Sequence, residues 1–116
     1  MRLSFQRSGD VGIVRVEDPK LTYPGLSAFF ASVVDLVDGD ARKVLIDLEV
    51  VSFIDSAAIG CLVDIHRLLV ERGGAVKLAA LQPRVGTMLT MAGLTRILDV
   101  HPRTEDALAA FNAPPR

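Results

Sequence analysis

Short, mostly apolar runs alternate along this chain with longer segments whose apolar residues recur at helical spacing. The runs Lys43–Leu48 and Ala75–Leu81 are typical of strands that are buried on both faces of a sheet. The segments Ser56–Arg72 and Pro83–Gly93 place apolar residues at intervals of three and four, as amphipathic helices do. Because helices that separate strands act as right-handed crossovers, this alternation predicts an α/β fold built on a mostly parallel sheet.

The start of the chain predicts an antiparallel pair of strands in front of this unit. Apolar residues alternate with polar ones in Leu3–Phe5 and Val11–Val16, and Ser8-Gly9-Asp10 between them is typical of a hairpin turn. A loop is expected at Leu21–Gly25, where Pro24-Gly25 is the turn signal. The antiparallel first strand therefore joins the parallel strands in one mixed sheet.

The ends of two helices carry capping signals. Ser27 is the expected N-cap of the first helix and Thr104 that of the last, because their hydroxyl oxygens can accept hydrogen bonds from free backbone N–H groups. Glu105 and Asp106 follow in the first turn of the last helix, where the helix dipole favours acids. Gly39 is expected to end the first helix in a left-handed conformation.

The predicted order of elements is ββαβαβαβα. This order gives a mixed sheet of about five strands, accompanied by four helices. The last strand is expected at Arg96–Val100, and Gly73-Gly74 ends the longest helix. We expect a single domain over residues 1–112 and a C-terminal tail over residues 113–116.

Charge and cysteine content exclude several classes of protein. Thirteen Lys or Arg residues against fourteen Asp or Glu residues argue against a nucleic-acid binder or a polybasic membrane-surface protein. The longest near-continuous apolar stretch, Ala57–Val63, is much shorter than the about 20 residues of a membrane-spanning helix. The single cysteine, Cys61, predicts a free thiol in a reducing cytoplasm. His66 and His101 are 35 residues apart and have no flanking pattern of carboxylates or cysteines, so no metal or other cofactor is expected.

The segment Phe53–Gly60 contains the most informative candidate residue, Ser56, which follows a tight turn and opens the longest helix. Free N–H groups and the helix dipole favour an anion at such a position, so a phosphate on Ser56 could be held without disturbing the fold. The simpler interpretation is that the Ser56 hydroxyl is an N-cap.

One side of this helix is a candidate docking surface for a partner protein. Small and charged residues lie there, opposite an apolar side, and the small ones would let a partner backbone approach. The docking side consists of Ala57, Gly60, Asp64, Arg67 and Glu71, and the apolar side of Ala58, Leu62, Ile65 and Leu69. The alternative is a plain solvated face with charges at helical spacing. Cys61 lies between the two sides and is expected to be a small, half-buried filler.

A hydrolase does not fit this segment. Phe53–Ala58 lacks both glycines of a nucleophile elbow, and Asp55 is too close in sequence to orient a histidine that faces Ser56. The chain also lacks a phosphate-binding Gly-Lys-Ser/Thr loop, so we expect no enzymatic activity.

The run Asp55–Gly60, which reads DSAAIG, together with Val44–Leu48 and Phe53, resembles the signature of the STAS-domain family. Its single-domain members are bacterial anti-sigma factor antagonists, and the order of strands and helices resembles that fold over nearly the whole chain. The resemblance implies that a partner anti-sigma factor, which is also a serine kinase, phosphorylates Ser56 beside the acid Asp55. It implies that the unphosphorylated form binds this partner and frees a sigma factor, and that a serine phosphatase resets the switch.

The chain departs from the family pattern at two places. Many members have a second Ser or Thr and then Gly where this chain has Ala57 and Ala58, and many have Gly-x-Leu-Asp where it has Pro19–Thr22 without the acid. The missing acid slightly favours a second interpretation, a constitutive scaffold subunit of a signalling or lipid-transport complex without a phospho-switch. In the first interpretation, the expected partner-binding residues are Thr22, Ala57, Gly60, Asp64 and Arg67.

Overall fold

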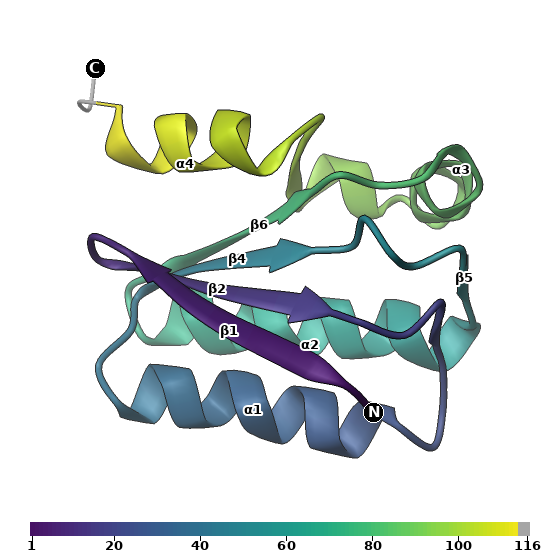
Figure 1. Ribbon diagram of the computed structural model, residues 1–116, viewed down its shortest axis with the longest axis horizontal. Helices are drawn as coiled ribbons and strands as arrows, with labels where there is room; N and C mark the ends of the chain where they lie inside the picture. Colours follow the sequence, from purple (N-terminus) through teal and green to yellow (C-terminus); the bar gives the residue numbers. More distant parts are fainter. Residues whose placement is uncertain (114–116) are drawn as a thin grey trace.

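The computed structural model describes residues 1–113, which fold into one five-stranded sheet with helices on both faces (Figure 1). Strands β1 (Leu3–Ser8) and β2 (Val11–Val16) form the predicted antiparallel hairpin. The turn between them contains Gly9 at a φ of 58°, a left-handed conformation that glycine adopts without steric cost. Of the predicted tail, only Ala113 lies within the described residues.

Three further strands extend the sheet in parallel. They are β4 (Lys43–Asp47), β6 (Ala75–Ala79) and β7 (Asp99–His101), and the order across the sheet is β1-β2-β4-β6-β7. All pairs beyond the first hairpin are parallel. The prediction of a mixed, mostly parallel sheet with an antiparallel first strand is therefore confirmed.

The four predicted helices are present and form two layers. Helices α1 (Leu26–Asp38) and α2 (Ser56–Glu71) lie side by side on one face of the sheet, and α4 (Thr104–Asn112) lies on the other (Figure 1). Helix α3 (Pro83–Met91) lies near the end of the sheet where α2 begins, and Pro83 occupies its first turn as expected. None of the helices within residues 1–113 is long and apolar enough to span a membrane.

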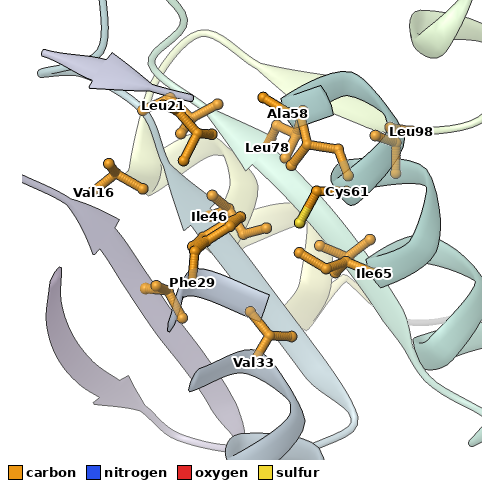
Figure 2. Packing of buried hydrophobic residues seen from close by; sticks show 14 of the residues in the cluster. Val16, Leu21, Phe29, Val33, Ile46, Ala58, Cys61, Ile65, Leu78 and Leu98 are labelled. Carbon is orange, nitrogen blue, oxygen red and sulfur yellow. The ribbon is translucent and has the colours of Figure 1, made fainter. Parts of the chain in front are cut away.

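The sheet separates a large apolar cluster under α1 and α2 from a small one under α4. In the large cluster, Phe29 of α1 and Ile65 of α2 pack around Ile46 of β4 (Figure 2). Leu45, the neighbour of Ile46 on the same strand, belongs instead to the small cluster, with Phe111 of α4. Strand β4 is therefore buried on both faces, which explains its almost continuous apolar sequence.

Two short strands were not expected. Strand β3 (Lys20–Leu21) pairs in parallel with β5 (Phe53–Ile54) in a separate two-stranded sheet, although the sequence predicts a loop from Leu21. The carbonyl of Pro19 also accepts hydrogen bonds from the N–H groups of Ser52 at 2.8 Å and Phe53 at 3.2 Å. Strands of two residues show no measurable period in the sequence, but this pair brings the loop at residues 22–25 to the start of α2.

Both predicted N-cap assignments are wrong. Helix α1 begins one residue before Ser27 and has Gly25 as its N-cap, because Leu26 is drawn into the large apolar cluster. Helix α4 has Arg103 as its N-cap, and the Thr104 hydroxyl hydrogen-bonds a carboxylate oxygen of Asp47 at 3.3 Å instead. Glu105 and Asp106 do occupy the first turn of α4.

Two other predicted boundaries also shift. Asp40, at a φ of 75°, is the left-handed residue after α1, whereas Gly39 has a φ of −81°. Asp40 and Ala41 donate backbone hydrogen bonds to Val37 and Leu36, so the left-handed position falls one residue later than expected. A short 3₁₀ helix occupies Leu94–Arg96, and the last strand begins only at Asp99.

Candidate functional site

Ser56 is the first residue of α2, and its side chain is exposed to solvent. The N-cap of this helix is Asp55, whose Oδ1 accepts a hydrogen bond from the Ala58 N–H at 2.8 Å. The interpretation of Ser56 as the capping hydroxyl is therefore wrong, because the neighbouring carboxylate fills that role. Within residues 1–113, no protein group hydrogen-bonds the Ser56 hydroxyl, which leaves it accessible for modification.

The second oxygen of Asp55 holds the loop between β3 and α1. Its Oδ2 accepts a hydrogen bond from the Tyr23 N–H at 3.0 Å, and the Thr22 carbonyl accepts one from the Gly25 N–H at 3.0 Å within that loop. The Tyr23 side chain is 75% exposed. Sequence reasoning assigned Thr22 to the site but missed Tyr23, because the contact uses a backbone N–H that any residue except proline would offer.

An open groove of about 400 Å³ lies between α1 and α2, beside Ser56. From α2 the structure brings together three of the predicted docking residues, Ala57, Gly60 and Asp64, along its lining. The remaining lining residues were not predicted as site residues, and they are Leu26, Ser27 and Phe30 of α1 and Cys61 of α2. The right-handed crossovers between parallel strands could have predicted that α1 and α2 lie on one face of the sheet. They do not predict which side chains of α1 line the groove.

The rest of the predicted docking side lies outside this groove. Arg67 and Glu71 are exposed on α2 beyond Asp64, farther from the helix start than the groove. The four residues of the predicted apolar side of α2 are buried, so the division of the helix into two sides is correct.

Gly60 is not required by the fold of the chain itself. A Cβ atom added at this position would meet no other heavy atom within 4 Å. A glycine inside a helix costs about 1 kcal/mol relative to alanine, so the chain carries a destabilising residue where its own packing would accept a larger one. Such a position is suited to the close approach of a second molecule.

Cys61 forms part of the groove floor, but its thiol is not activated. The residue is only 9% exposed, and its side chain joins the large apolar cluster (Figure 2). Burial, with a smaller contribution from the negative charge of Asp64, raises the pKa of the Cys61 thiol to about 11. The residue is more buried than the half-buried filler that the sequence predicts.

We expect Cys61 to react slowly with alkylating reagents. With a pKa of about 11, the thiolate is about one part in a thousand at pH 8, against roughly a quarter for an ordinary thiol. Iodoacetamide labelling at pH 8, followed by mass spectrometry, should therefore be at least about a hundredfold slower in the native protein than in the same protein unfolded in guanidinium. Equal rates in the two samples would show that the thiol is accessible and ordinary.

A second polar cluster lies on the opposite face of the sheet and is satisfied internally. The buried carboxylate of Asp47 contacts the Arg15 guanidinium at 3.2 Å and accepts a hydrogen bond from the Glu49 N–H at 2.9 Å. Together with the bond from Thr104, these contacts attach the start of α4 to β2 and β4. The polar contacts therefore fix the start of α4, while the small apolar cluster packs the rest of the helix against the sheet.

Comparison with known proteins agrees with this architecture. Residues 2–107 match the family described as the STAS domain. A putative anti-sigma factor antagonist from Thermotoga maritima has 22% sequence identity and a TM-score of 0.90, over 96% of this chain and 95% of that one. The anti-sigma factor antagonist SpoIIAA in its unphosphorylated form has 16% identity and a TM-score of 0.83, over 99% of this chain and 100% of that one.

Two further structures bear on the possible roles of the fold. SpoIIAA of Bacillus in its phosphorylated form has 17% identity and a TM-score of 0.73, over 95% of this chain and 99% of that one. A murine solute carrier anion transporter has 22% identity and a TM-score of 0.80, over 94% of this chain but only 19% of the transporter. At these identities the likeness establishes the fold.

Proposed function

The chain belongs to the STAS-domain family, and we propose that it acts as an anti-sigma factor antagonist whose partner changes with the phosphorylation of Ser56. In this proposal the unphosphorylated form binds an anti-sigma factor that is also a serine kinase, and a sigma factor is released. Phosphorylation of Ser56 ends this binding, and a serine phosphatase restores it. The chain supplies the substrate hydroxyl and performs no catalysis.

The observation that carries the proposal is the environment of Ser56. Its hydroxyl is exposed at the first position of α2, and the capping role that would occupy it belongs to Asp55. Free N–H groups and the helix dipole favour negative charge at this position, so the folded domain can accept a phosphate there. A kinase can therefore modify Ser56 without unfolding the helix.

The groove beside Ser56 supports a docking role for the same end of the molecule. Leu26 and Phe30 supply apolar surface, Gly60 permits close approach, and Asp64 offers a charge that a basic partner residue can pair. Because the groove and Ser56 are adjacent, a partner that fills the groove would lie against the serine. Binding and phosphorylation would then involve one surface.

The likeness to SpoIIAA supports the switch, since that protein has been solved in both unphosphorylated and phosphorylated forms with the same fold as this chain. The likeness to part of an anion transporter supports the second candidate, a constitutive interaction module of a larger assembly. The absence of an acid at Thr22 also favours this second candidate. Genes for a small serine kinase or serine phosphatase beside this gene would favour the switch, and transporter genes would favour the module.

Phosphate on Ser56 in the native cell is the expected result that tests the proposal most directly. Protein isolated from its own cells with phosphatases inhibited should show a phosphorylated fraction at Ser56 by peptide mass spectrometry. Ser27, an exposed serine that lines the groove, serves as the internal control and should remain unmodified. Absence of phosphate under several growth conditions would favour the constitutive module.

Filling the groove should weaken partner binding without harming the fold. Gly60→Trp places a large side chain in the groove, at a position where an added Cβ meets no other heavy atom within 4 Å, so we expect a loss of affinity of at least about tenfold, or about 1.4 kcal/mol. Gly86→Trp on α3 is the matched control, because a Cβ there also meets open space but lies outside the groove. Titration of the partner checks both variants, and equal affinities would show that the groove is not the docking surface.

A further inference from the structure

The Asp55 carboxylate joins two separate parts of the site, the start of α2 and the loop at residues 22–25. We propose that phosphorylation of Ser56 opens this Asp55 bridge, defined by its hydrogen bonds from the Tyr23 and Ala58 N–H groups, so that the loop is released when the switch turns off. The inference rests on the proposed function for the phosphorylation event. The bridge itself is a feature of the unphosphorylated structure.

Each oxygen of the carboxylate serves a different element. Oδ1 accepts from the Ala58 N–H at 2.8 Å, and Oδ2 accepts from the Tyr23 N–H at 3.0 Å. Within residues 1–113, the second of these is the hydrogen bond that connects residues 22–25 with the start of α2. The pairing of β3 with β5 ends at Leu21, so the loop beyond it depends on Asp55 for this attachment.

A phosphate on Ser56 acts on the bridge in two ways. It places a charge of about −1.5 to −2 next to the negatively charged Asp55, and like charges repel. Its oxygens also compete for the N–H groups at the start of α2, including the Ala58 N–H that now binds Oδ1. Because the two oxygens belong to one planar group, rotation of the carboxylate away from Ala58 also withdraws Oδ2 from Tyr23.

The released loop carries an aromatic side chain that a partner can contact. Tyr23 is 75% exposed, and tyrosine is among the residues that contribute most to protein interfaces. The charge on Ser56 would therefore alter two parts of the binding surface, the serine itself and the position of Tyr23. The chain contains one tyrosine and no tryptophan, so intrinsic fluorescence reports on this loop alone.

The first part of the test breaks the loop arm of the bridge without phosphate. Asp55→Asn has one acceptor oxygen in place of two, and asparagine is an effective N-cap, so it keeps the Ala58 bond and loses the Tyr23 bond. We expect amide hydrogen exchange measured by NMR to become at least about tenfold faster at Tyr23 and to stay within about twofold at Ala58. Unchanged exchange at Tyr23 would show that the bridge does not hold the loop.

The second part uses phosphoserine incorporated at position 56 during translation, so that no kinase is needed. Tyr23 amide exchange should again be at least about tenfold faster than in unmodified protein, with increased quenching of Tyr23 fluorescence by acrylamide. Phosphoserine at position 8, the last residue of β1 before the hairpin turn at the opposite end of the sheet, is the charge-matched control and should change neither (Figure 1).

The outcomes separate this inference from the proposed function. If phosphoserine at position 56 leaves Tyr23 exchange unchanged, the bridge stays closed and the inference is wrong, whatever happens to partner binding. If the bridge opens but affinity for the anti-sigma factor is unchanged, the inference stands and the proposed switch is wrong.

Discussion

Leu62→Ala is expected to lower the free energy of unfolding by about 2–5 kcal/mol, which is a large part of the stability of a domain of this size. Leu62 is 1% exposed and lies in the large apolar cluster between α2 and the sheet. Its truncation removes apolar atoms from the core and leaves a cavity that the surrounding strands and α1 can fill only in part. Urea denaturation followed by circular dichroism measures the effect.

The matched control for this prediction lies two residues away on the same helix. Asp64 is exposed at the groove, so Asp64→Trp should change the free energy of unfolding by no more than about 0.5–1 kcal/mol while weakening partner binding. Leu62→Ala should have the opposite profile, with a large stability loss in a domain that still binds when folded. Equal destabilisation by the two variants would mean that the two sides of α2 are wrongly assigned.

The parts of the fold that were predicted are those in which burial leaves a pattern in the sequence. Strand β4 is buried on both faces, so it is almost continuously apolar, and α2 is buried on one side, so its apolar residues recur at helical spacing. These two patterns, repeated along the chain, limit the topology through the crossover rule. The order of elements and the mixed sheet follow from them.

Other features depend on where distant backbone groups meet, and a sequence pattern does not record this. Strands β3 and β5 have two residues each, and their pairing is decided by tertiary position. The start of α1 is set by the burial of Leu26, which overrides the capping preference of Ser27. For the same reason, the predictions of helix ends were less accurate than the predictions of helix existence.

The candidate site also has parts that the sequence pattern predicts and parts that depend on tertiary contacts. The position of Ser56 at a helix start was predictable, because a buried strand, a turn and an amphipathic helix follow one another in the sequence. The groove was only half predictable, because α1 contributes Leu26, Ser27 and Phe30 to it. The contact between Asp55 and the Tyr23 N–H could not be predicted, since the N–H group is common to almost every residue.

The largest effect is expected from charge at Ser56. Ser56→Ala should bind the anti-sigma partner within about threefold of the unmodified protein, because the serine hydroxyl makes no hydrogen bond within residues 1–113 and its loss removes only a small exposed group. This variant cannot be phosphorylated, so it should remain permanently active. Phosphorylated protein should bind at least about a hundredfold more weakly, or by about 2.8 kcal/mol.

The physical reason is that the domain and its partner differ in how they receive the new charge. The start of α2 favours an anion, so phosphorylation should leave the fold stable. A partner that packs against a neutral hydroxyl must instead desolvate a charge of about −1.5 to −2 or lose its contacts.

Ser56→Asp carries a single charge on a shorter group, so its affinity should fall between those of Ser56→Ala and the phosphorylated protein. Isothermal titration of the partner against all four forms, with circular dichroism to confirm folding, checks this order. Equal affinity in all four would leave the constitutive module as the function of this chain.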